Sequence, residues 1–475
     1  MKYQEEKLAM KKRFVALTDI YRLPDDKQNE IDDVESMIRL LLYADNIDIE
    51  GLIATSSFCL HNGGTEKEKK AILDIIDSYE KVLPNLRVHA AGYPDADYLR
   101  SVTKYGITGF GYRLGRGFGE EKYNDNEGVK HIIAVVDKDD PRPVWFGLWG
   151  GCNTLAQAVW KVWKSRSAED FDKFIRKIRV YGISDQDKGG RWLRQTFGDR
   201  LFYIVSPSSG GSLTLAGAGF VGATWTGMCW DGSTVSKLAK GFEGAETKYI
   251  SNEWLKSNIC GESPYRKQYP LPTVGMEGDT PTYLGLIENG LNDMEHPNYG
   301  SWGGRYEFKY PDKYPAFTRK EKYPIWTDAN DTIILKDGRS LTNNVCSLYR
   351  WRKAVQLDFA ARMRWTEASE YKDANHPPVV KLSTPQEITV KPGSKVSLSA
   401  DGSFDPDGDL LFYKWFNYKE AGNHTQVVKV EDDDKPIASF TAPNIDCTLH
   451  FILELTDGGT PALTSYARVI VHVEK

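Results

Sequence analysis

The sequence has few cysteines, and they are not grouped. Its six cysteines stand singly at positions 59, 152, 229, 260, 346 and 447, with no CxxC pair and no cysteine–histidine spacing typical of zinc. Neither a zinc site nor a disulfide framework therefore follows from the sequence.

A positive charge balance and a long apolar run are also absent. The net charge of -5 disfavours phosphate binding, so we expect no nucleic-acid partner. No apolar stretch approaches the length that a membrane-spanning helix needs. Residues 1–12 contain no apolar core of the kind found in signal peptides.

The composition that remains is that of a soluble globular protein. Hydrophobic residues make up 40% and charged residues 27% of 475 residues, a length for which two domains are the default expectation. The 13 tryptophans and 25 tyrosines are numerous. Exposed aromatic rings stack on sugars, although core packing accounts for most aromatic residues in any protein.

Residues 13–55 predict a β-α-β unit. Apolar runs at 14–17 and 49–54 have strand character, and between them residues 34–43 have apolar positions at helical spacing. Ligands of open α/β sheets bind at the carboxyl ends of the strands. Here that end carries the acidic residues Asp19, Glu30, Asp32 and Asp33.

Crowded carboxylates raise one another's pKa unless a cation or hydrogen-bond donors compensate for their charge. The acidic group therefore predicts a site for a hard cation with oxygen ligands, with calcium as first choice. The alternative is that Asp32 and Asp33 stabilise the amino end of the following helix. The residues alone leave both interpretations open.

Two further predicted strands end in polar residues. The strand at 144–148 precedes two glycines and a helix at 154–163, and the strand at 178–182 precedes Asp185, Gln186 and Asp187. These three side chains can accept hydrogen bonds from sugar hydroxyls, or they form a solvated turn. The glycine-rich segment 106–119 lacks the strand and helix of a dinucleotide site, so we interpret it as a lid or rim.

The carboxyl-terminal part of the chain has a different sequence pattern. After a stiff Asn375–Pro378 linker, short alternating strands separated by turns predict a β-sandwich. We therefore expect domains at 13–376 and 377–475. The acidic loop at 401–409 resembles loops of polycystic-kidney-disease and cadherin modules, and it predicts either a tight turn or a calcium site.

The acidic unit resembles a known family. Asp19 and the Asp32–Asp33 pair are similar to the aspartate cluster of nucleoside hydrolases, except that Leu17 replaces the first aspartate and the loop 20–31 is longer. The resemblance is closer to the nucleoside-hydrolase-like family of bacterial cellulose-binding proteins, whose motifs appear here as Thr18-Asp19-Ile20, Asn29-Glu30, Asp32-Asp33, Ser36, Arg39 and Leu41-Leu42-Tyr43.

Later motifs continue the resemblance over about residues 13–365. The run from Gly150 to Ala156 is similar to one in which a backbone carbonyl binds calcium, and this implies the carbonyl of Cys152 with Asn153 beside it. Asp279, in the run 276–281, matches a late aspartate that completes the calcium shell. The run 300–305 also matches the cellulose-binding family, and its Trp302 and Arg305 are assigned to the substrate.

The resemblance implies an α/β fold, with an open, mostly parallel sheet covered by helices on both faces, followed by a small immunoglobulin-like β-sandwich. It implies a calcium-dependent hydrolase acting on an O- or N-glycosyl bond of a carbohydrate or nucleoside-like substrate, with Asp19 activating water. The implied calcium ligands are Asp19, Asp32, Asp33, Asp279 and the Cys152 carbonyl. The implied substrate-binding residues are Glu30, Asn153, Asp185, Gln186, Asp187, Trp302 and Arg305.

A protein of another class fits the same motifs, namely a noncatalytic binding protein for cellulose or another plant-cell-wall glycan. Leu17, and the lack of a histidine beside Asp279, where His296 is the nearest in sequence, favour a sugar-to-sugar bond over a nucleoside. Because exported proteins are usual in the family, a periplasmic or extracellular location after loss of a signal peptide is expected. The sequence leaves open whether the protein forms a homo-oligomer.

Overall fold

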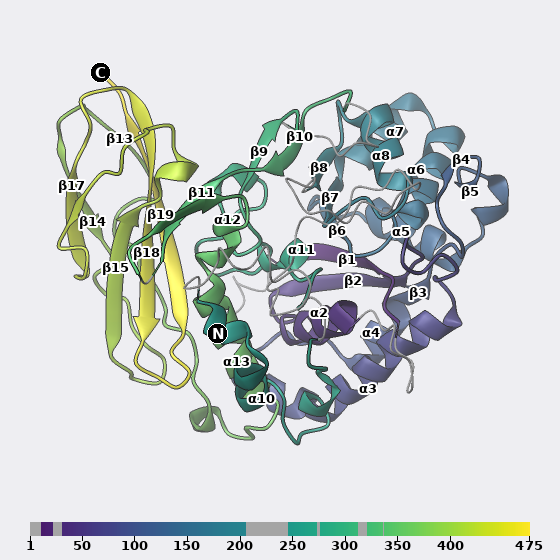
Figure 1. The fold of residues 1–475 in the computed structure, drawn as a ribbon, viewed down its shortest axis with the longest axis horizontal. Coiled ribbons are helices and arrows are strands. Elements are labelled where there is room, and N and C mark those ends of the chain that lie inside the picture. The colour runs from purple at the N-terminus through teal and green to yellow at the C-terminus, as the bar shows by residue number, and fades with distance from the viewer. Residues whose placement is uncertain (1–10, 22–30, 206–245, 273–275, 312–320, 336) are drawn as a thin grey trace.

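The computed structural model describes residues 11–21, 31–205, 246–272, 276–311, 321–335 and 337–475. A large mostly parallel sheet with helices on both faces is followed by a β-sandwich at the carboxyl-terminal end of the chain (Figure 1). The fold class predicted from the sequence is confirmed.

The large sheet has eight strands among the described residues, in the order β3-β2-β1-β6-β7-β8-β10-β9. All neighbouring pairs are parallel except β10 and β9. In this order their bounds are Thr103–Tyr105, Ile47–Ala54, Lys12–Thr18, Val144–Leu148, Ile178–Gly182, Phe202–Val205, Ile325–Asp328 and Tyr306–Lys309. The polar residues that follow β1, β2, β6 and β7 therefore share one edge of the sheet.

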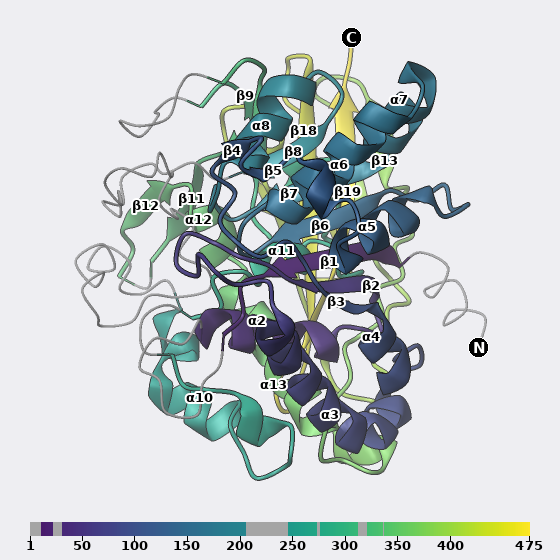
Figure 2. The same cartoon turned by 90° about the vertical axis from the view of Figure 1, so that its right-hand side faces the viewer.

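Successive side chains along the strands point to opposite faces of the sheet, and each face is covered by its own apolar core. Phe14 and Ala16 of β1 face one core, while Val15 and Leu17 face the other, as a two-residue repeat requires. Figure 2 shows α2 and α3 on one side of β1 and β2, with α5 and α6 on the other. The first core is covered by α2 (Ile31–Leu42), α3 (Glu66–His89) and α13 (Arg352–Trp365), and the second by α5 (Glu127–Asp137), α6 (Asn153–Ser165), α7 (Ala168–Arg176) and α8 (Gly189–Phe197).

The remaining described elements are short. The helices are α4 (Ala96–Val102), α10 (Asn252–Asn258), α11 (Pro281–Leu284) and α12 (Cys346–Tyr349). The strands outside the two large units are β4 (Arg113–Leu114), β5 (Gly117–Phe118), β11 (Asp331–Ile334) and β12 (Ser340–Asn343). None of the helices in the described part of the chain has the length and hydropathy that a membrane crossing requires.

Helix α3 is longer than the sequence predicted. The apolar spacing predicts a helix from about Glu66 to Val82 that ends at Pro84, and a short strand from Val88 to Ala91. The observed helix instead continues to His89, and residues 88–91 form no strand. Pro84 and Glu80 are both exposed, so the Glu80 carbonyl that loses its helical partner faces water. Leu83 and Leu86 extend the buried stripe of the helix beyond the proline, and this burial outweighs the lost bond.

The carboxyl-terminal sandwich packs two sheets around its own apolar core. One sheet has the order β13-β19-β18-β15, and the other has the order β14-β17-β16. Their bounds are Glu387–Val390 (β13), Lys395–Ser399 (β14), Leu411–Asn417 (β15), Val430–Glu431 (β16), Ile437–Thr441 (β17), Cys447–Asp457 (β18) and Thr464–Val473 (β19). The sequence pattern predicts a strand at 426–430, but of these residues only Val430 is in β16.

The outer face of β18 and β19 packs against the α/β part of the molecule. Ile452 and Tyr466 belong to the same buried cluster as Trp302 and Trp351. The Arg468 guanidinium, also buried, donates to the backbone carbonyls of Leu291 (3.1 Å) and Gly300 (2.9 Å). An apolar, hydrogen-bonded interface therefore joins the sandwich to the rest of the structure.

Candidate functional site

Three carboxylates converge at the carboxyl edge of the large sheet. Asp32 and Asp33 lie in the first turn of α2, and Asp279 lies just before α11. One ligand atom from each of the three lies within 4.8 Å of the others. Asp33 and Asp279 are buried, whereas Asp32 keeps a partly exposed side chain. We call these three residues the carboxylate cluster.

Asp19 adjoins this cluster from the end of β1. Its side chain is buried, and its Oδ1 has no hydrogen-bond partner among the described residues. Burial raises the pKa of Asp19 to about 7; a hydrogen bond from Ser57 opposes this rise and the charge of Asp32 adds to it. A buried carboxylate oxygen without a donor is the kind of group that a cation or a bound water satisfies.

Thr18 connects the end of β1 to the start of α2. Its hydroxyl donates to Asp33 Oδ1 and accepts a hydrogen bond from the Ile20 N–H at 3.0 Å. Burial raises the pKa of Asp32, while backbone N–H groups, including that of Gly278, lower it. Asp32 and Asp33 lie in the first turn of α2, where the helix dipole favours negatively charged side chains. The two aspartates can therefore stabilise the amino end of the helix and also serve as ligands of a cation.

A buried network holds the segment 276–280 against α2. Glu277 accepts two hydrogen bonds from the Arg39 guanidinium, at 2.5 and 3.0 Å, and its backbone N–H donates to Glu35 Oε2 at 2.8 Å. All three side chains are fully buried. Since Glu277 is two residues from Asp279 and Arg39 is on the helix that carries Asp32 and Asp33, this network sets the geometry of the carboxylate cluster.

Two glycines leave room for the carboxylates. A Cβ built at Gly150 would lie 2.6 Å from Asp19 Oδ1, and one at Gly278 would lie 2.5 Å from Asp32 Oδ2. Any larger residue at these positions would displace a carboxyl group. The donor atoms are all oxygens and carry negative charge, a set that fits a calcium ion better than a softer metal.

Cys152 and Asn153 lie at the amino end of α6. The Cys152 carbonyl accepts the Ala156 N–H at 2.9 Å, so it is part of the helical hydrogen-bond ladder. The Asn153 side chain is fully buried; its Nδ2 donates to Ser56 Oγ and to the carbonyls of Ile107 and Gly109. Their predicted contacts with calcium and substrate stay predictions, and the bonds observed here organise the loop around α6.

The segment 185–187 is also engaged within the protein. Asp185 is buried in an ion pair with Arg194. Asp187 accepts backbone N–H groups of Asn153 (2.8 Å) and Gly189 (2.6 Å), and Gln186 donates to the Trp149 carbonyl. The solvated turn is therefore not what forms; the two aspartates are buried and their polar atoms hold the loop after β7 to neighbouring elements.

Trp302 and Arg305, two further predicted site residues, form hydrogen bonds and ion pairs with other parts of the protein. Trp302 Nε1 donates to the Tyr466 hydroxyl at 3.3 Å, and Arg305 pairs with buried Asp331 at 2.6 Å. Glu30 lies outside the described residues. His296 contacts Asp293 and stacks on Tyr299, which in turn contacts His450 of β18. A substrate contact by Trp302 or Arg305 stays a prediction that these bonds do not support.

Sequence reasoning missed the roles of Thr18, Ser57 and the Arg39–Glu277 pair. A signal for the pair was present, because an arginine inside the apolar run of α2 has to find an acidic partner when it is buried. Ser57 left no comparable signal, because its contact with Asp19 depends on the pairing of β1 with β2.

Family comparisons cover both parts of the chain. Residues 13–306 match the nucleoside hydrolase-like domain of the family described as cellulose-binding Sde182, and residues 395–473 match the carboxyl-terminal domain described for cellulose-binding protein Sde0182. The chain belongs to this family. The resemblance found in the sequence is thereby confirmed, and the family match includes Asp19 and the carboxylate cluster.

One solved structure resembles the chain over its whole length. It is a nucleoside hydrolase-related hypothetical protein from Saccharophagus degradans, described as associated with carbohydrate metabolism, with 32% identity and a TM-score of 0.78. The match covers 98% of this chain and 100% of that one. A PKD domain from the KIAA 1837 protein matches 20% of this chain and 87% of its own, at 22% identity and a TM-score of 0.16. None of the curated proteins matches the chain.

Proposed function

We propose that this protein binds calcium at Asp32, Asp33 and Asp279 and hydrolyses a glycosidic bond of a carbohydrate bound beside that ion. The observation that carries the proposal is the convergence of three carboxylates next to the buried Asp19, whose Oδ1 has no partner among the described residues. Without a cation, so many acidic groups in one place would be mutually destabilising.

Calcium, when bound, would orient sugar hydroxyls and make a bound water more acidic. Asp32, Asp33 and Asp279 would hold it, while the Arg39–Glu277 pair keeps their two segments together. Carbonyl oxygens and waters commonly complete the six to eight ligands that calcium takes.

Asp19 is the proposed proton acceptor. A carboxylate beside a bound cation is ionised at neutral pH, because the opposite charge lowers its pKa. Its Oδ1 is then available to accept a proton from water as the water oxygen bonds to the anomeric carbon. The bond from that carbon to the leaving-group oxygen breaks in the same step, and the leaving oxygen takes a proton from solvent. The surrounding negative charge stabilises the positive charge that develops on the sugar ring in an oxocarbenium-like transition state.

A sugar fits these residues better than a nucleoside. Leu17 stands where nucleoside hydrolases carry an additional aspartate, and His296, the nearest histidine in sequence to Asp279, contacts Asp293 and Tyr299 instead. The family's description as cellulose-binding points the same way. It also supports a second candidate function, in which the same site holds a glycan and calcium without turnover.

Two isosteric variants separate ion binding from chemistry. Asp33→Asn should abolish calcium binding in a calorimetric titration and remove the rise in melting temperature that calcium causes in the wild type. Asp19→Asn should retain most calcium binding but lose turnover of plant-cell-wall oligosaccharides by about 100- to 10,000-fold, the usual contribution of a general base. The exposed Asp74→Asn serves as control, because the side chain of Asp74 forms an ion pair with Lys70 on the surface of α3, away from the carboxylate cluster.

The outcomes distinguish the two functions. Product release that depends on both calcium and Asp19 supports the hydrolase. Calcium-dependent glycan binding with no product from oligosaccharides or nucleosides over long incubation supports the binding protein. A wild-type protein that binds no calcium would contradict both, since each relies on the carboxylate cluster.

A further inference from the structure

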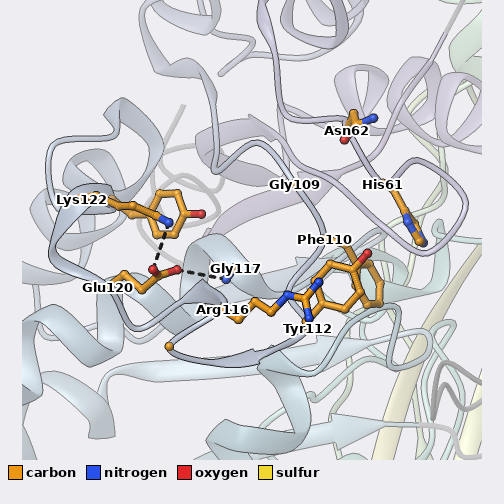
Figure 3. Close-up of a pocket in the computed structure, with 11 residues that line it drawn as sticks. His61, Asn62, Gly109, Phe110, Tyr112, Arg116, Gly117, Glu120 and Lys122 are labelled. Carbon is orange, nitrogen blue, oxygen red and sulfur yellow. Dashed lines mark hydrogen bonds and ion pairs between the residues drawn. The ribbon is translucent and has the colours of Figure 1, made fainter.

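A pocket of about 370 Å³ lies at the same edge of the sheet as the carboxylate cluster. Figure 3 shows that its walls come from the loop after β2, with His61 and Asn62, and from the glycine-rich segment 109–123. The volume is within the range of small-molecule sites. This pocket is not part of the carboxylate cluster.

One wall of the pocket is aromatic. The rings of His61 and Phe110 stack at 4.8 Å, and Tyr112 meets Phe110 edge-on at 4.9 Å. Tyr112 is 42% exposed although it is a large, mostly apolar side chain. The Arg116 guanidinium lies 4.3 Å from the centre of the Tyr112 ring (Figure 3). Together these groups form a broad surface of π-systems with a polar edge.

The other wall supplies hydrogen-bonding groups. Glu120 and Lys122 form an ion pair at 3.0 Å, and Glu120 also accepts the Gly117 N–H at 3.2 Å. Arg116, which also lines the pocket, forms no ion pair with a carboxylate among the described residues, and its guanidinium lies over the Tyr112 ring. The pocket thus combines an aromatic face that carries the Arg116 donor with the acceptor and donor of Glu120 and Lys122.

The pocket is held in shape by buried bonds. Asn153 Nδ2 and Ser56 Oγ both donate to the Gly109 carbonyl at 2.9 Å. Gln157 accepts the Gly119 N–H at 2.6 Å and donates to the Glu120 carbonyl at 3.0 Å. Gly117 has φ of 97°, and a Cβ there would collide with the Phe110 carbonyl. Such a preorganised loop loses little entropy when a ligand binds.

A short stretch of chain connects this pocket to the carboxylate cluster. Ser57 bonds to Asp19, its neighbour Ser56 bonds to Gly109, and His61 and Asn62 line the pocket a few residues later. Because β1 and β2 are adjacent and parallel, the loops that follow them lie side by side. The loop that contacts Asp19 therefore also forms one wall of the pocket.

We propose that this pocket is a second sugar subsite, in which a pyranose ring of a β-glucan chain packs on the Tyr112–His61 wall and hydrogen-bonds to Arg116 and Glu120. The inference rests on the proposed function, since it extends the glycan bound at the carboxylate cluster by further residues. Sugar rings present an apolar C–H face to an aromatic ring while their hydroxyls remain available at the edge, and this pocket offers both.

The length dependence of binding tests the subsite. Calorimetric titrations in calcium would compare cellobiose with cellopentaose for the wild type, Tyr112→Ala and Arg116→Ala. We expect the wild type to bind cellopentaose more tightly than cellobiose. Tyr112→Ala should lose about tenfold or more of its affinity for cellopentaose, as for a typical aromatic hot spot, and less than about twofold for cellobiose.

Tyr98→Ala is the matched control. Tyr98 is 41% exposed, close to the value for Tyr112, but lies on α4, near Glu50, Asp48 and Arg13 at the amino ends of the strands. It should bind both oligosaccharides as the wild type does. Circular-dichroism melts of each variant would show that the fold persists.

Each outcome bears on one of the two proposals. If Tyr112→Ala and Arg116→Ala bind cellopentaose like the wild type while Asp33→Asn does not, the subsite is wrong and the carboxylate cluster stands. If the wild type binds neither oligosaccharide, the subsite is wrong, whereas the calcium titration and the turnover assays still decide the proposed function. The β-glucan assignment is wrong if Arg116→Ala weakens the binding of uronic-acid oligosaccharides only, or if Tyr112→Ala weakens the binding of nucleosides only.

Discussion

Gly150 shows how closely single residues determine the proposed site. Its position leaves only a hydrogen atom facing Asp19, because a Cβ would lie 2.6 Å from Oδ1. We expect Gly150→Ala to displace the Asp19 carboxyl group and to reduce turnover on the order of 100-fold, the typical cost of misplacing a catalytic group by about 1 Å. Initial rates at saturating calcium would measure the effect.

Gly182→Ala provides the control for that variant. Gly182 also ends a central strand, but a Cβ added there would have Leu148 Cδ1 as its nearest neighbour at 3.5 Å, an ordinary van der Waals contact. We expect this variant to keep wild-type turnover. If Gly150→Ala kept it as well, the position of Asp19 would not matter for the chemistry.

Glu277 carries a second prediction at the residue scale, this time on stability. It is the carboxylate partner of the buried Arg39, at 2.5 Å. We expect Glu277→Gln to lower the free energy of unfolding by about 3–5 kcal/mol, because it leaves a buried guanidinium without its counter-charge. Urea unfolding monitored by fluorescence would measure the change.

A surface pair gives the comparison for Glu277. Glu288 lies 3.6 Å from Lys12, and both side chains are partly exposed. Glu288→Gln should therefore change the free energy of unfolding by no more than about 1 kcal/mol. Equal effects of the two substitutions would mean that the Arg39–Glu277 pair does not hold the segment 276–280 against α2.

At the scale of elements, local pattern is enough to predict the strands and helices around the site. The strand predicted at 178–182 has its observed bounds, and those predicted at 14–17 and 49–54 lie within β1 and β2. Apolar runs end where the backbone reaches the polar edge of the sheet, so the sequence itself marks the strand ends. For this reason the local pattern alone places Asp19, Asp32 and Asp33 at one edge of the sheet.

Other features depend on partners far away in the chain. The Asn153 amide donates to Ser56, Ile107 and Gly109, whose approach no local pattern reveals, and its contact with a substrate stays a prediction. Trp302 and Arg305 likewise find Tyr466 and Asp331. A motif match shows which residues of the chain correspond to a family's motifs. Only the packed structure shows which of their polar groups already have hydrogen-bond partners within the protein.

At the scale of the whole molecule, the sandwich and the α/β part meet through one buried cluster. Trp351 lies 5.6 Å from the Tyr466 ring, and Tyr418 donates to buried Asp331 at 2.6 Å. The interface thus combines aromatic packing with buried polar bonds. Its stability therefore depends on keeping those polar groups in the protonation states that the bonds require.

His450 of β18 makes the interface sensitive to acid. The ring is buried, and its Nδ1 accepts a hydrogen bond from Arg468 at 3.1 Å. Burial lowers the pKa of His450 to about 3, and the positive charge of Arg468 adds to this effect, with smaller contributions from His472 and His296. Tyr299 packs against the ring at 4.5 Å. The folded protein therefore keeps this histidine neutral.

The sign of the pH dependence follows from that shift. The unfolded chain protonates His450 near pH 6.5, whereas the folded protein does so only near pH 3. Its contribution to stability is fully present above pH 6.5 and is lost as the pH falls toward 3. The loss amounts to about 1.4 kcal/mol per pH unit in that window, or about 2 kcal/mol at pH 5.

His450→Gln tests this assignment, because glutamine can still accept a hydrogen bond from Arg468 but does not titrate. We expect urea unfolding between pH 7.5 and pH 5 to show a smaller loss of stability for this variant than for the wild type, by about 2 kcal/mol. His424→Gln, at a partly exposed position of the same sandwich, should follow the wild-type curve. If His450→Gln follows it too, acid sensitivity does not arise at the contact between His450 and Arg468, and the interface tolerates protonation there.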